Sequence, residues 1–423
     1  MRRIAIGILI MALTAVGAVY VLNTRDEAPP DAGTAFSVAP EQIARGAYLA
    51  RAGNCEGCHT ARGGMPYAGG RGIDTPFGTV YAPNLTAAAK TGLGEWTPAD
   101  FWRALHNGRS RDGRLLYPAF PYPNYTHVTR DDADALFAYL RSLPAVERAN
   151  RPHALRFPYD HQVALAVWRA LYFRPGTFVP EADRSAEWNR GAYLVQGLGH
   201  CNACHSSRNF LGATDGTLDL NGGLIPTQNW YAPSLTSTRE AGLAQWDPDE
   251  IVALLKAGVA KRGSVSGPMA AVVARSTQFL SDADLHAMAA YLKTLPESPE
   301  LPVRNAKSLN ATQHAQGAEL YRQHCSHCHG DDGAGIPGAY PPLAGNRAVT
   351  LEPPANFIRM VLGGGFPPGT AGNPRPYGMP PFVTILGDDD SAAVISYVRD
   401  AWGNRGSPVS AFTVGRFRGH RRD

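Results

Sequence analysis

A five-residue pattern that occurs three times constrains this 423-residue chain more than any other feature. The pattern is Cys-x-x-Cys-His, and its copies lie at residues 55–59, 201–205 and 325–329. One helical turn places two cysteines and the following histidine around the edge of one porphyrin, and this is the attachment signature of a c-type haem. The chain has six cysteines, and the three copies use all of them. The sequence therefore predicts three covalently attached haems c.

Each predicted haem is held by two thioether bonds to cysteine and is ligated at the iron by the histidine that follows. The predicted attachment residues are Cys55, Cys58, Cys201, Cys204, Cys325 and Cys328. The predicted iron ligands are His59, His205 and His329.

Other uses of Cys-x-x-Cys fit the chain less well. A zinc site needs ligands paired across a loop of roughly 12 to 20 residues, whereas these motifs lie more than a hundred residues apart. A redox-active thiol pair needs only the two cysteines, and a disulfide framework would not place histidine after every second cysteine. Haem attachment is the interpretation that uses every residue of the pattern.

Length and composition favour several small, loop-rich domains. At about 150 residues per domain, the chain has room for three, and its 45 glycines and 34 prolines are typical of modules with many loops. The net charge of +4 is too small to indicate nucleic-acid binding, so we expect no nucleic-acid partner.

The N-terminus predicts export from the cytoplasm. Arg2 and Arg3 precede an apolar run over residues 4–22, as in a secretory signal. This run is longer than a usual signal core and approaches the length of a membrane span. We favour an anchor retained in the membrane over a cleaved signal peptide. The basic end stays in the cytoplasm, so the folded part is expected on the periplasmic side of a bacterial inner membrane.

A pair of helices accompanies each motif. Residues 45–49, 190–194 and 316–321 precede the motifs with a shared glycine, and residues 136–140, 288–292 and 394–398 follow at the far end with a shared tyrosine. A glycine on one helix lets an aromatic residue of another approach its backbone closely. This predicted crossing resembles the class I cytochrome c fold, in which the terminal helices cross beside the haem motif.

The repeats predict a mainly α fold of three tandem class I cytochrome c-like domains behind the N-terminal apolar segment. Residues 81–86 and 231–236 share Tyr-Ala-Pro-x-Leu-Thr, which the third repeat lacks. The apolar spacing of residues 159–173 predicts a docked helix within the linker. The predicted ranges are 1–24 for the signal or anchor, 41–144, 185–298 and 309–403 for the three domains, 145–184 for the helical linker and 404–423 for a solvated basic tail.

Two methionines are candidates for the sixth iron ligand, which raises the reduction potential of a haem. Met379 lies in Gly-Met-Pro-Pro just before the last helix of the third domain, where the class I fold carries its methionine ligand. Met269 follows Gly-Pro at the equivalent place in the second domain. We expect Met288 to be a core residue instead.

The first domain breaks this pattern, because Phe120 stands where the methionine is expected. Phenylalanine cannot coordinate iron. His127, Met65 and His106 are the alternatives that the sequence offers, with His127 preferred among them, and a site without a protein ligand is also open. A second histidine would lower the potential, whereas an open site could bind a small molecule.

The whole pattern resembles the three-haem cytochrome c subunits of bacterial membrane-bound dehydrogenase complexes. The resemblance covers about residues 41–403 and rests on the haem motifs, Arg-Gly-Ala-Tyr-Leu, the Tyr-Ala-Pro repeats, Gly-Pro-Met and Gly-Met-Pro-Pro. Members serve quinoprotein alcohol dehydrogenases, flavin-dependent sugar and sugar-acid dehydrogenases, and molybdenum aldehyde or nicotinate dehydrogenases. The Phe120 version is more similar to the molybdenum group.

This resemblance implies an electron-transfer subunit with no substrate-oxidising site of its own. Its partners would be a large dehydrogenase subunit with a molybdenum, quinone or flavin cofactor, and ubiquinone or a terminal oxidase as acceptor. Two alternatives remain, namely a peroxidase-like haem enzyme that uses an open first haem and a free-standing electron shuttle or oxidase subunit.

Overall fold

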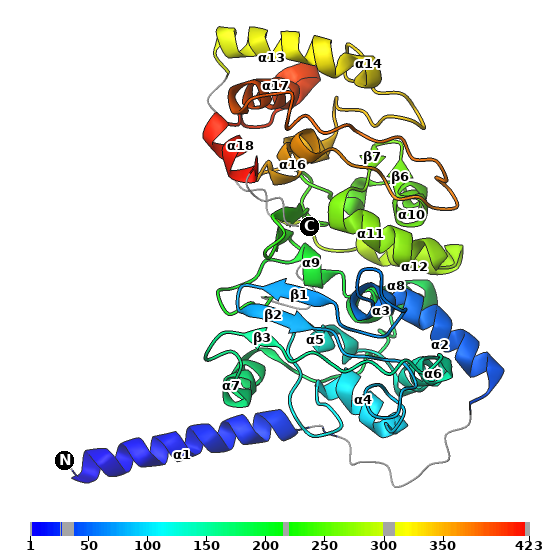
Figure 1. Ribbon diagram of the computed structural model, residues 1–423, viewed down its shortest axis with the longest axis vertical. Helices are drawn as coiled ribbons and strands as arrows, with labels where there is room; N and C mark the ends of the chain where they lie inside the picture. Colours follow the sequence, from blue (N-terminus) through cyan, green and yellow to red (C-terminus); the bar gives the residue numbers. More distant parts are fainter. Residues whose placement is uncertain (1, 26, 28–37, 215–219, 299–308, 419–423) are drawn as a thin grey trace. The chain divides into compact units, whose positions relative to one another are not determined.

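The chain is mainly α-helical in the computed structural model, which describes residues 2–25, 27, 38–214, 220–298 and 309–418 (Figure 1). These residues form two compact units. Unit one comprises 1–185, 192–203 and 208–218, and unit two comprises 186–191, 204–207 and 219–423. The predicted second domain, 185–298, contributes to both units, so the compact units do not coincide with three consecutive domains.

Unit one contains the N-terminal helix and the elements around the first motif. Its antiparallel sheet has the order β1 (Gly72–Thr75), β2 (Gly78–Tyr81) and β3 (Ala154–Leu155). A π-helical turn, η1 (Leu194–Leu198), leads into the second motif on α9 (Asn202–His205). The helices are α1 (Arg2–Thr24), α2 (Pro40–Ala52), α3 (Cys55–His59), α4 (Pro98–Asn107), α5 (Tyr122–Tyr125), α6 (Arg130–Ser142) and α7 (Gln162–Tyr172).

Unit two contains most of the second repeat and all of the third. It has two short hairpins, β4–β5 (Gly223–Ile225, Trp230–Ala232) and β6–β7 (Val259–Ala260, Gly263–Ser264). Short 3₁₀ turns lie at η2 (Leu243–Gln245), η3 (Thr277–Phe279) and η4 (Ala401–Gly403). The helices are α8 (Ala186–Tyr193), α10 (Pro248–Ala257), α11 (Gly267–Arg275), α12 (Asp282–Lys293), α13 (Ala311–His324), α14 (Ser326–His329), α15 (Arg347–Thr350), α16 (Ala355–Gly363), α17 (Asp388–Asp400) and α18 (Ala411–Arg418).

The predicted helix crossings are confirmed in all three repeats. A Cβ added to the shared glycine would collide with a backbone carbonyl of the partner helix, beside the Cβ of the shared tyrosine. Glycine therefore permits each crossing, and any larger side chain would force the helices apart. The contacts are Gly46 with Ala135 and Tyr139, Gly191 with Ala287 and Tyr291, and Gly317 with Ala393 and Tyr397.

A polar pair fastens each crossing beside its glycine. The residue before the glycine donates a hydrogen bond to an aspartate in the first turn of the second helix. This explains why an arginine or glutamine precedes each shared glycine. The pairs are Arg45–Asp132, Arg190–Asp284 and Gln316–Asp390, at 2.8, 2.8 and 2.9 Å.

Proline and capping residues fix where the helices begin. Pro98 and Pro248 open α4 and α10, where a missing N–H costs no hydrogen bond. Thr97 and Asp100 form a capping box at the start of α4. Thr129 and Ser281 cap α6 and α12, the second helices of the first two crossings.

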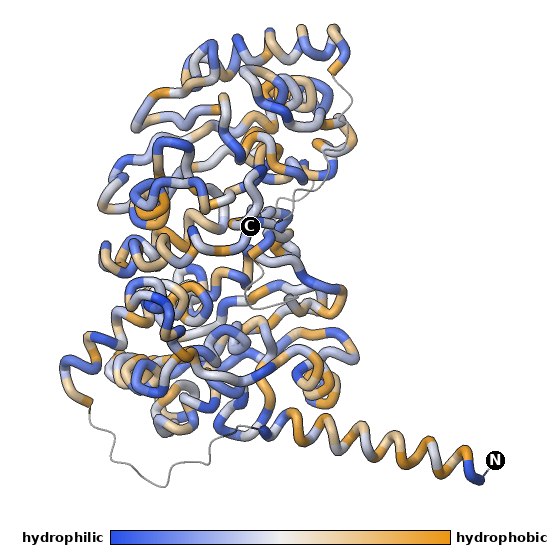
Figure 2. Tube along the Cα trace, turned by 180° about the vertical axis from the view of Figure 1, so that it is seen from behind, coloured by the Kyte–Doolittle hydropathy of each residue, from blue (hydrophilic) through white to orange (hydrophobic). Residues whose placement is uncertain are grey.

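The linker between the first two motifs contains a docked helix, as predicted. Helix α7 buries Leu165, Arg169 and Ala170 against unit one. The end of α1 contacts this helix, because the Asn23 side chain donates to the Ala166 carbonyl at 2.9 Å and accepts from Arg169 Nε at 2.9 Å. Figure 2 shows α1 as a largely apolar rod that extends from this contact.

The expectation of a solvated tail after residue 404 is wrong for residues 404–418. Helix α18 packs on α16 and α17, with Val414 fully buried and Val409 nearly so. Arg418 donates to the Leu386 carbonyl at 2.5 Å. The prediction rested on the many arginines of this segment and overlooked its two valines, which are buried. Residues 419–423 lie outside the described residues.

Candidate functional site

Each Cys-x-x-Cys-His motif occupies a single short turn of helix. The turns are α3, α9 and α14, each preceded by the first helix of its crossing or by the π-turn that extends it. None of the six cysteines forms a disulfide within the described residues, and none is fully buried. A single helical turn that carries two cysteines and a histidine is the arrangement of the c-type haem attachment signature.

Two of the cysteines, Cys55 and Cys325, do not have the character of a redox-active thiol. Burial, followed by the charge of the neighbouring cysteine, raises the pKa of Cys55 to about 12 and that of Cys325 to about 11. Reactive Cys-x-x-Cys pairs have lowered pKa values because the thiolate is stabilised. Within the residues that the structure describes, no cluster of three His, Cys, Asp or Glu side chains could hold a metal ion.

The three motif histidines share one orientation. In each, Nδ1 lies within hydrogen-bond distance of a proline carbonyl oxygen, at 2.8 Å for His59–Pro83, 2.7 Å for His205–Pro233 and 3.1 Å for His329–Pro341. An Nδ1–H that donates to this carbonyl leaves the Nε2 lone pair free to coordinate a metal. The same bond holds the ring plane, as second-shell partners do in metal sites. These residues therefore fit an axial haem ligand.

The protonation state of these histidines also suits ligation. Burial lowers the pKa of His59, His205 and His329, while the carbonyl hydrogen bond acts in the opposite direction more weakly. The rings are consequently neutral near pH 7, and neutral imidazole is the form that binds iron.

Sequence reasoning missed the role of the prolines. Pro83 and Pro233 are the third residues of the two Tyr-Ala-Pro-x-Leu-Thr repeats, which the sequence shows but does not explain. The third repeat lacks that motif, yet Pro341 in Tyr-Pro-Pro fulfils the same role 12 residues after its histidine. Downstream of each motif, the proline follows a tyrosine by one or two residues. This shared spacing is the sequence signal that could have identified the prolines.

The candidate sixth-ligand residues lie in different local structures. Met379 forms a two-bond backbone bridge with Gly365, at 2.8 and 3.0 Å, and its side chain packs on the core that includes Tyr321 and Ile358. Met269 is not in a loop, since it lies in the first turn of α11. Met288 is buried, as expected for a core residue.

Phe120 lies in an aromatic cluster instead of a ligand loop. Its ring centroid is 5.2 Å from that of Tyr125, whose hydroxyl donates to the Gly53 carbonyl at 3.2 Å. Burial raises the pKa of Tyr125, and the nearby thiols Cys55 and Cys58 add to the effect. The Phe120 loop thus faces the first motif through Tyr125.

The three alternative ligands of the first site have different surroundings. Met65 is exposed after the motif. His106 is buried, stacks on Trp102 at 4.5 Å and has Nδ1 2.9 Å from the Thr126 carbonyl, as a core histidine would. His127 accepts a bond at its carbonyl from Phe178, and its Nε2 is buried with no hydrogen-bond partner among the described residues.

Comparison with known proteins agrees with this geometry. The sequence matches the cytochrome c family over residues 43–144 and 314–402. It is 38% identical to the cytochrome c subunit of the quinone alcohol dehydrogenase of Gluconacetobacter polyoxogenes, over 88% of this chain and 84% of that protein. It is 37% identical to the gluconate 2-dehydrogenase cytochrome c subunit of Pantoea cypripedii, over 86% of each chain.

A third relative is a longer protein. One of the subunits of the nicotinate dehydrogenase of Pseudomonas putida is 40% identical over 88% of this chain, which corresponds to 31% of that protein. The fold and the motifs define a haem-binding electron-transfer protein of the cytochrome c class. The chain belongs to the family of cytochrome c subunits of dehydrogenase complexes.

Proposed function

We propose that this chain carries three haems c in three cytochrome c domains, 41–144, 185–298 and 309–403. It relays electrons from a large dehydrogenase subunit to ubiquinone or a terminal oxidase on the periplasmic side of the membrane. Bound haem c supplies one-electron chemistry at iron. The observation that carries the proposal is the histidine–proline carbonyl bond, which recurs at all three motifs.

The chain's own residues attach, orient and tune the cofactor. Two cysteines of each motif form the thioether bonds. His59, His205 and His329 would hold the iron, and their proline carbonyls fix the ring and the tautomer. Met269 and Met379 would supply a second protein ligand to the iron in the second and third domains. The first site has no methionine in this loop, and His127 remains its preferred protein candidate.

Haem stoichiometry tests the proposal. Pyridine haemochrome absorbance divided by protein concentration is expected to give three haems c per chain. Replacement of Cys201 and Cys204 by alanine should remove one haem and leave two. Two haems per unmodified chain would contradict the proposal, and the corresponding double variant of each motif would identify the empty one.

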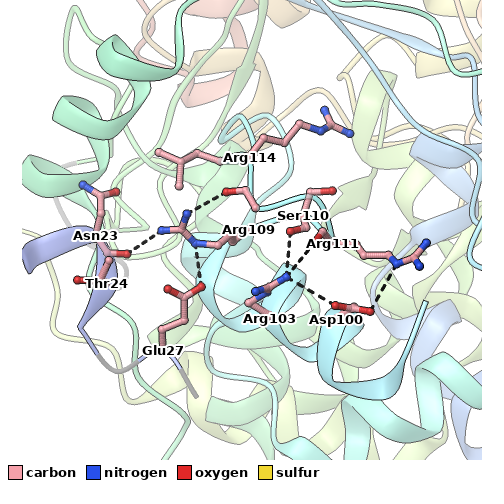
Figure 3. A network of polar contacts seen from close by, with 12 residues as sticks. Asn23, Thr24, Glu27, Asp100, Arg103, Arg109, Ser110, Arg111 and Arg114 are labelled. Atoms are coloured by element: carbon pink, nitrogen blue, oxygen red, sulfur yellow. Dashed lines mark hydrogen bonds and ion pairs between the residues drawn. The ribbon is translucent and has the colours of Figure 1, made fainter. Parts of the chain in front are cut away.

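Membrane association is supported by the first helix and its contact with the folded part. Helix α1 has 23 residues and is the one described helix long and apolar enough to span a membrane. Figure 3 shows Arg109 beside the C-terminal end of α1. Arg109 Nη2 donates to the Asn23 carbonyl at 3.1 Å, and Arg109 Nε pairs with Glu27 at 2.8 Å. An anchor bonded in this way would hold unit one against the bilayer.

The outer face of α7 fits a lipid surface beside this anchor. Val163, Val167 and Leu171 recur at four-residue spacing and are 76%, 43% and 57% exposed. Amphipathic helices insert such a stripe at the boundary between headgroups and acyl chains. The apolar stripe therefore supports the proposed position of unit one on the membrane.

Site-specific labelling tests this position in the full-length protein in nanodiscs. A fluorophore at Val163→Cys should be quenched by a lipid-borne quencher, whereas one at Val179→Cys should not. Val179 is a matched control because it is an equally exposed valine of the linker. The six native cysteines are occupied by haem under the proposal, so only the new thiol reacts. Equal quenching at both positions would contradict the proposed membrane contact.

Small-molecule chemistry at the first haem is a second candidate function, favoured by Phe120. A reduced-minus-oxidised spectrum with carbon monoxide tests it. Binding at one haem supports an open first site, and the absence of any binding excludes it. Co-purification of a large dehydrogenase subunit with the tagged chain would favour the relay over a free-standing shuttle.

A further inference from the structure

Helix α5 contacts the approaches to two haem motifs at once. It has four residues, Tyr122–Tyr125, and lies in unit one with the first motif and the first three residues of the second. Both contacts are therefore inside one compact unit. The helix is buried, with Tyr122, Asn124 and Tyr125 nearly inaccessible to solvent.

Tyr125 contributes the contact to the first motif and extends to the second. Its hydroxyl donates to the carbonyl of Gly53, two residues before Cys55, at 3.2 Å. The edge of the same ring meets the ring of His200, with centroids 5.7 Å apart and an interplanar angle of 87°. His200 directly precedes Cys201. One side chain thus touches the chain just before both thioether attachment points.

Asn124 contributes a second contact, which enters the second motif itself. Its Nδ2 donates to the Gln196 carbonyl and to Asn202 Oδ1, each at 2.8 Å. Asn202 lies between Cys201 and Cys204, and Asn124 and Asn202 are each only 4% exposed. A buried amide that loses such a partner is left unsatisfied, so this pair resists displacement.

Phe120, which stands where a methionine ligand was expected, packs on Tyr125 of α5. In the first domain, the residue at the ligand position packs its ring on the ring that spans the two motifs. Gly53 is also approached by the Leu198 side chain of the π-turn, so apolar packing closes the same junction. Apolar packing and hydrogen bonds therefore both connect the segments that precede the two motifs.

We propose that α5 is a spacer that fixes the separation and relative orientation of the first two haem motifs through Tyr125 and Asn124. The proposal rests on the proposed function, because it requires haem at both motifs. Tyr125 and Asn124 are positioning residues, since their hydrogen bonds go to the attachment segments. By holding these segments, they set how closely the two cofactors approach and so the rate of electron exchange between them.

The test uses the full-length haem-loaded protein and three variants. Asn124→Ala removes the bond to Asn202 in the second motif and the bond to Gln196 before it, and Tyr125→Phe removes only the bond to Gly53 while keeping the ring. Asn404→Ala is the matched control, because its buried amide likewise donates two bonds, to Leu343 and Val398, at 3.0 and 2.8 Å in unit two. Haem content and the three midpoint potentials are measured first for each variant.

The decisive readouts are the haem–haem dipolar coupling in electron paramagnetic resonance and the rate of internal electron exchange after a rapid reductive pulse. For Asn124→Ala, we expect a broadened coupling and a slower internal exchange than in the unmodified protein, because the two attachment segments are no longer held at one separation. Tyr125→Phe should show a smaller change of the same kind. Asn404→Ala should match the unmodified protein, with all midpoint potentials unchanged throughout.

Several outcomes overturn the spacer. Unchanged coupling and exchange in a fully loaded Asn124→Ala protein would contradict it while leaving the haem proposal intact. An equal change in Asn404→Ala would show a general loss of stability instead of positioning. Absence of haem from the first or second motif of the unmodified protein would refute both proposals together. If Asn124→Ala fails to fold, unchanged coupling in Tyr125→Phe and Asn124→Asp contradicts the spacer.

Discussion

The first and third motifs hold their histidines in the same way, but the surroundings of their proposed sixth-ligand residues differ. His59 and His329 both meet a proline carbonyl, in loops of different length and sequence. The residues proposed for the sixth position differ: Met379 belongs to a bridged loop packed on a core, whereas Phe120 belongs to an aromatic cluster that faces the first motif. The contact that holds the histidine ring is thus common to the two motifs, while the surroundings of the proposed sixth-ligand residues are not.

The largest predicted effect comes from removing the methionine of the third site. Met379→Ala should lower the midpoint potential of one haem by on the order of 0.2 V, or about 5 kcal/mol, because thioether ligation stabilises reduced iron. Spectroelectrochemistry measures this shift. Met288→Ala is the control, since loss of a buried methionine costs roughly 2–5 kcal/mol of folding stability and should leave all potentials unchanged. An unchanged set of potentials in Met379→Ala would exclude it as a ligand.

The converse change should make the first site resemble the third. Phe120→Met is expected to raise one potential by about 0.1 V and to abolish any carbon monoxide binding, because a thioether enters the sixth position. The measurement is redox titration with and without carbon monoxide. His127→Ala completes the test. If His127 already ligates, its removal opens a haem to carbon monoxide while Phe120→Met alone changes little.

The helix crossings should differ in how well they tolerate a methyl group. Gly46→Ala is expected to cost about 3 kcal/mol of unfolding free energy and Gly317→Ala about 2 kcal/mol, within the range for overpacking. An added Cβ would penetrate the Ala135 carbonyl more deeply than the Ala393 carbonyl. Denaturant titration of the loaded protein measures both. Gly63→Ala is not a suitable control because of its positive φ, whereas Gly176→Ala meets open space. The reverse order of costs would contradict the packing.

The smallest effect is expected at the proline that holds the first histidine. Pro83→Ala retains the accepting carbonyl, so it should cost less than about 1 kcal/mol, through added freedom of the unfolded chain. The midpoint potential of the first haem should stay unchanged. A large shift of that potential would show that the pyrrolidine ring, and not the carbonyl, supports His59.

Features carried by residue type and local spacing were predictable, whereas contacts to backbone carbonyls and contacts between side chains distant in sequence were not. The motifs, the glycine–tyrosine crossings, the proline helix starts and the docked linker helix follow from residue type and spacing. The proline carbonyls that orient the histidines leave no residue-specific mark, because any residue has a carbonyl. The bridge through Asn124 joins residues 78 positions apart, a separation that local periodicity does not encode.

Above all, we propose that three equivalent haem attachments have unequal sixth positions. The direct measurement is haem content per chain together with the near-infrared absorption of methionine-ligated ferric haem in the unmodified full-length protein. We expect three haems, of which the two at Met269 and Met379 contribute this absorption and the one at His59 does not. Methionine ligation at all three haems, or fewer than three haems per chain, would contradict it.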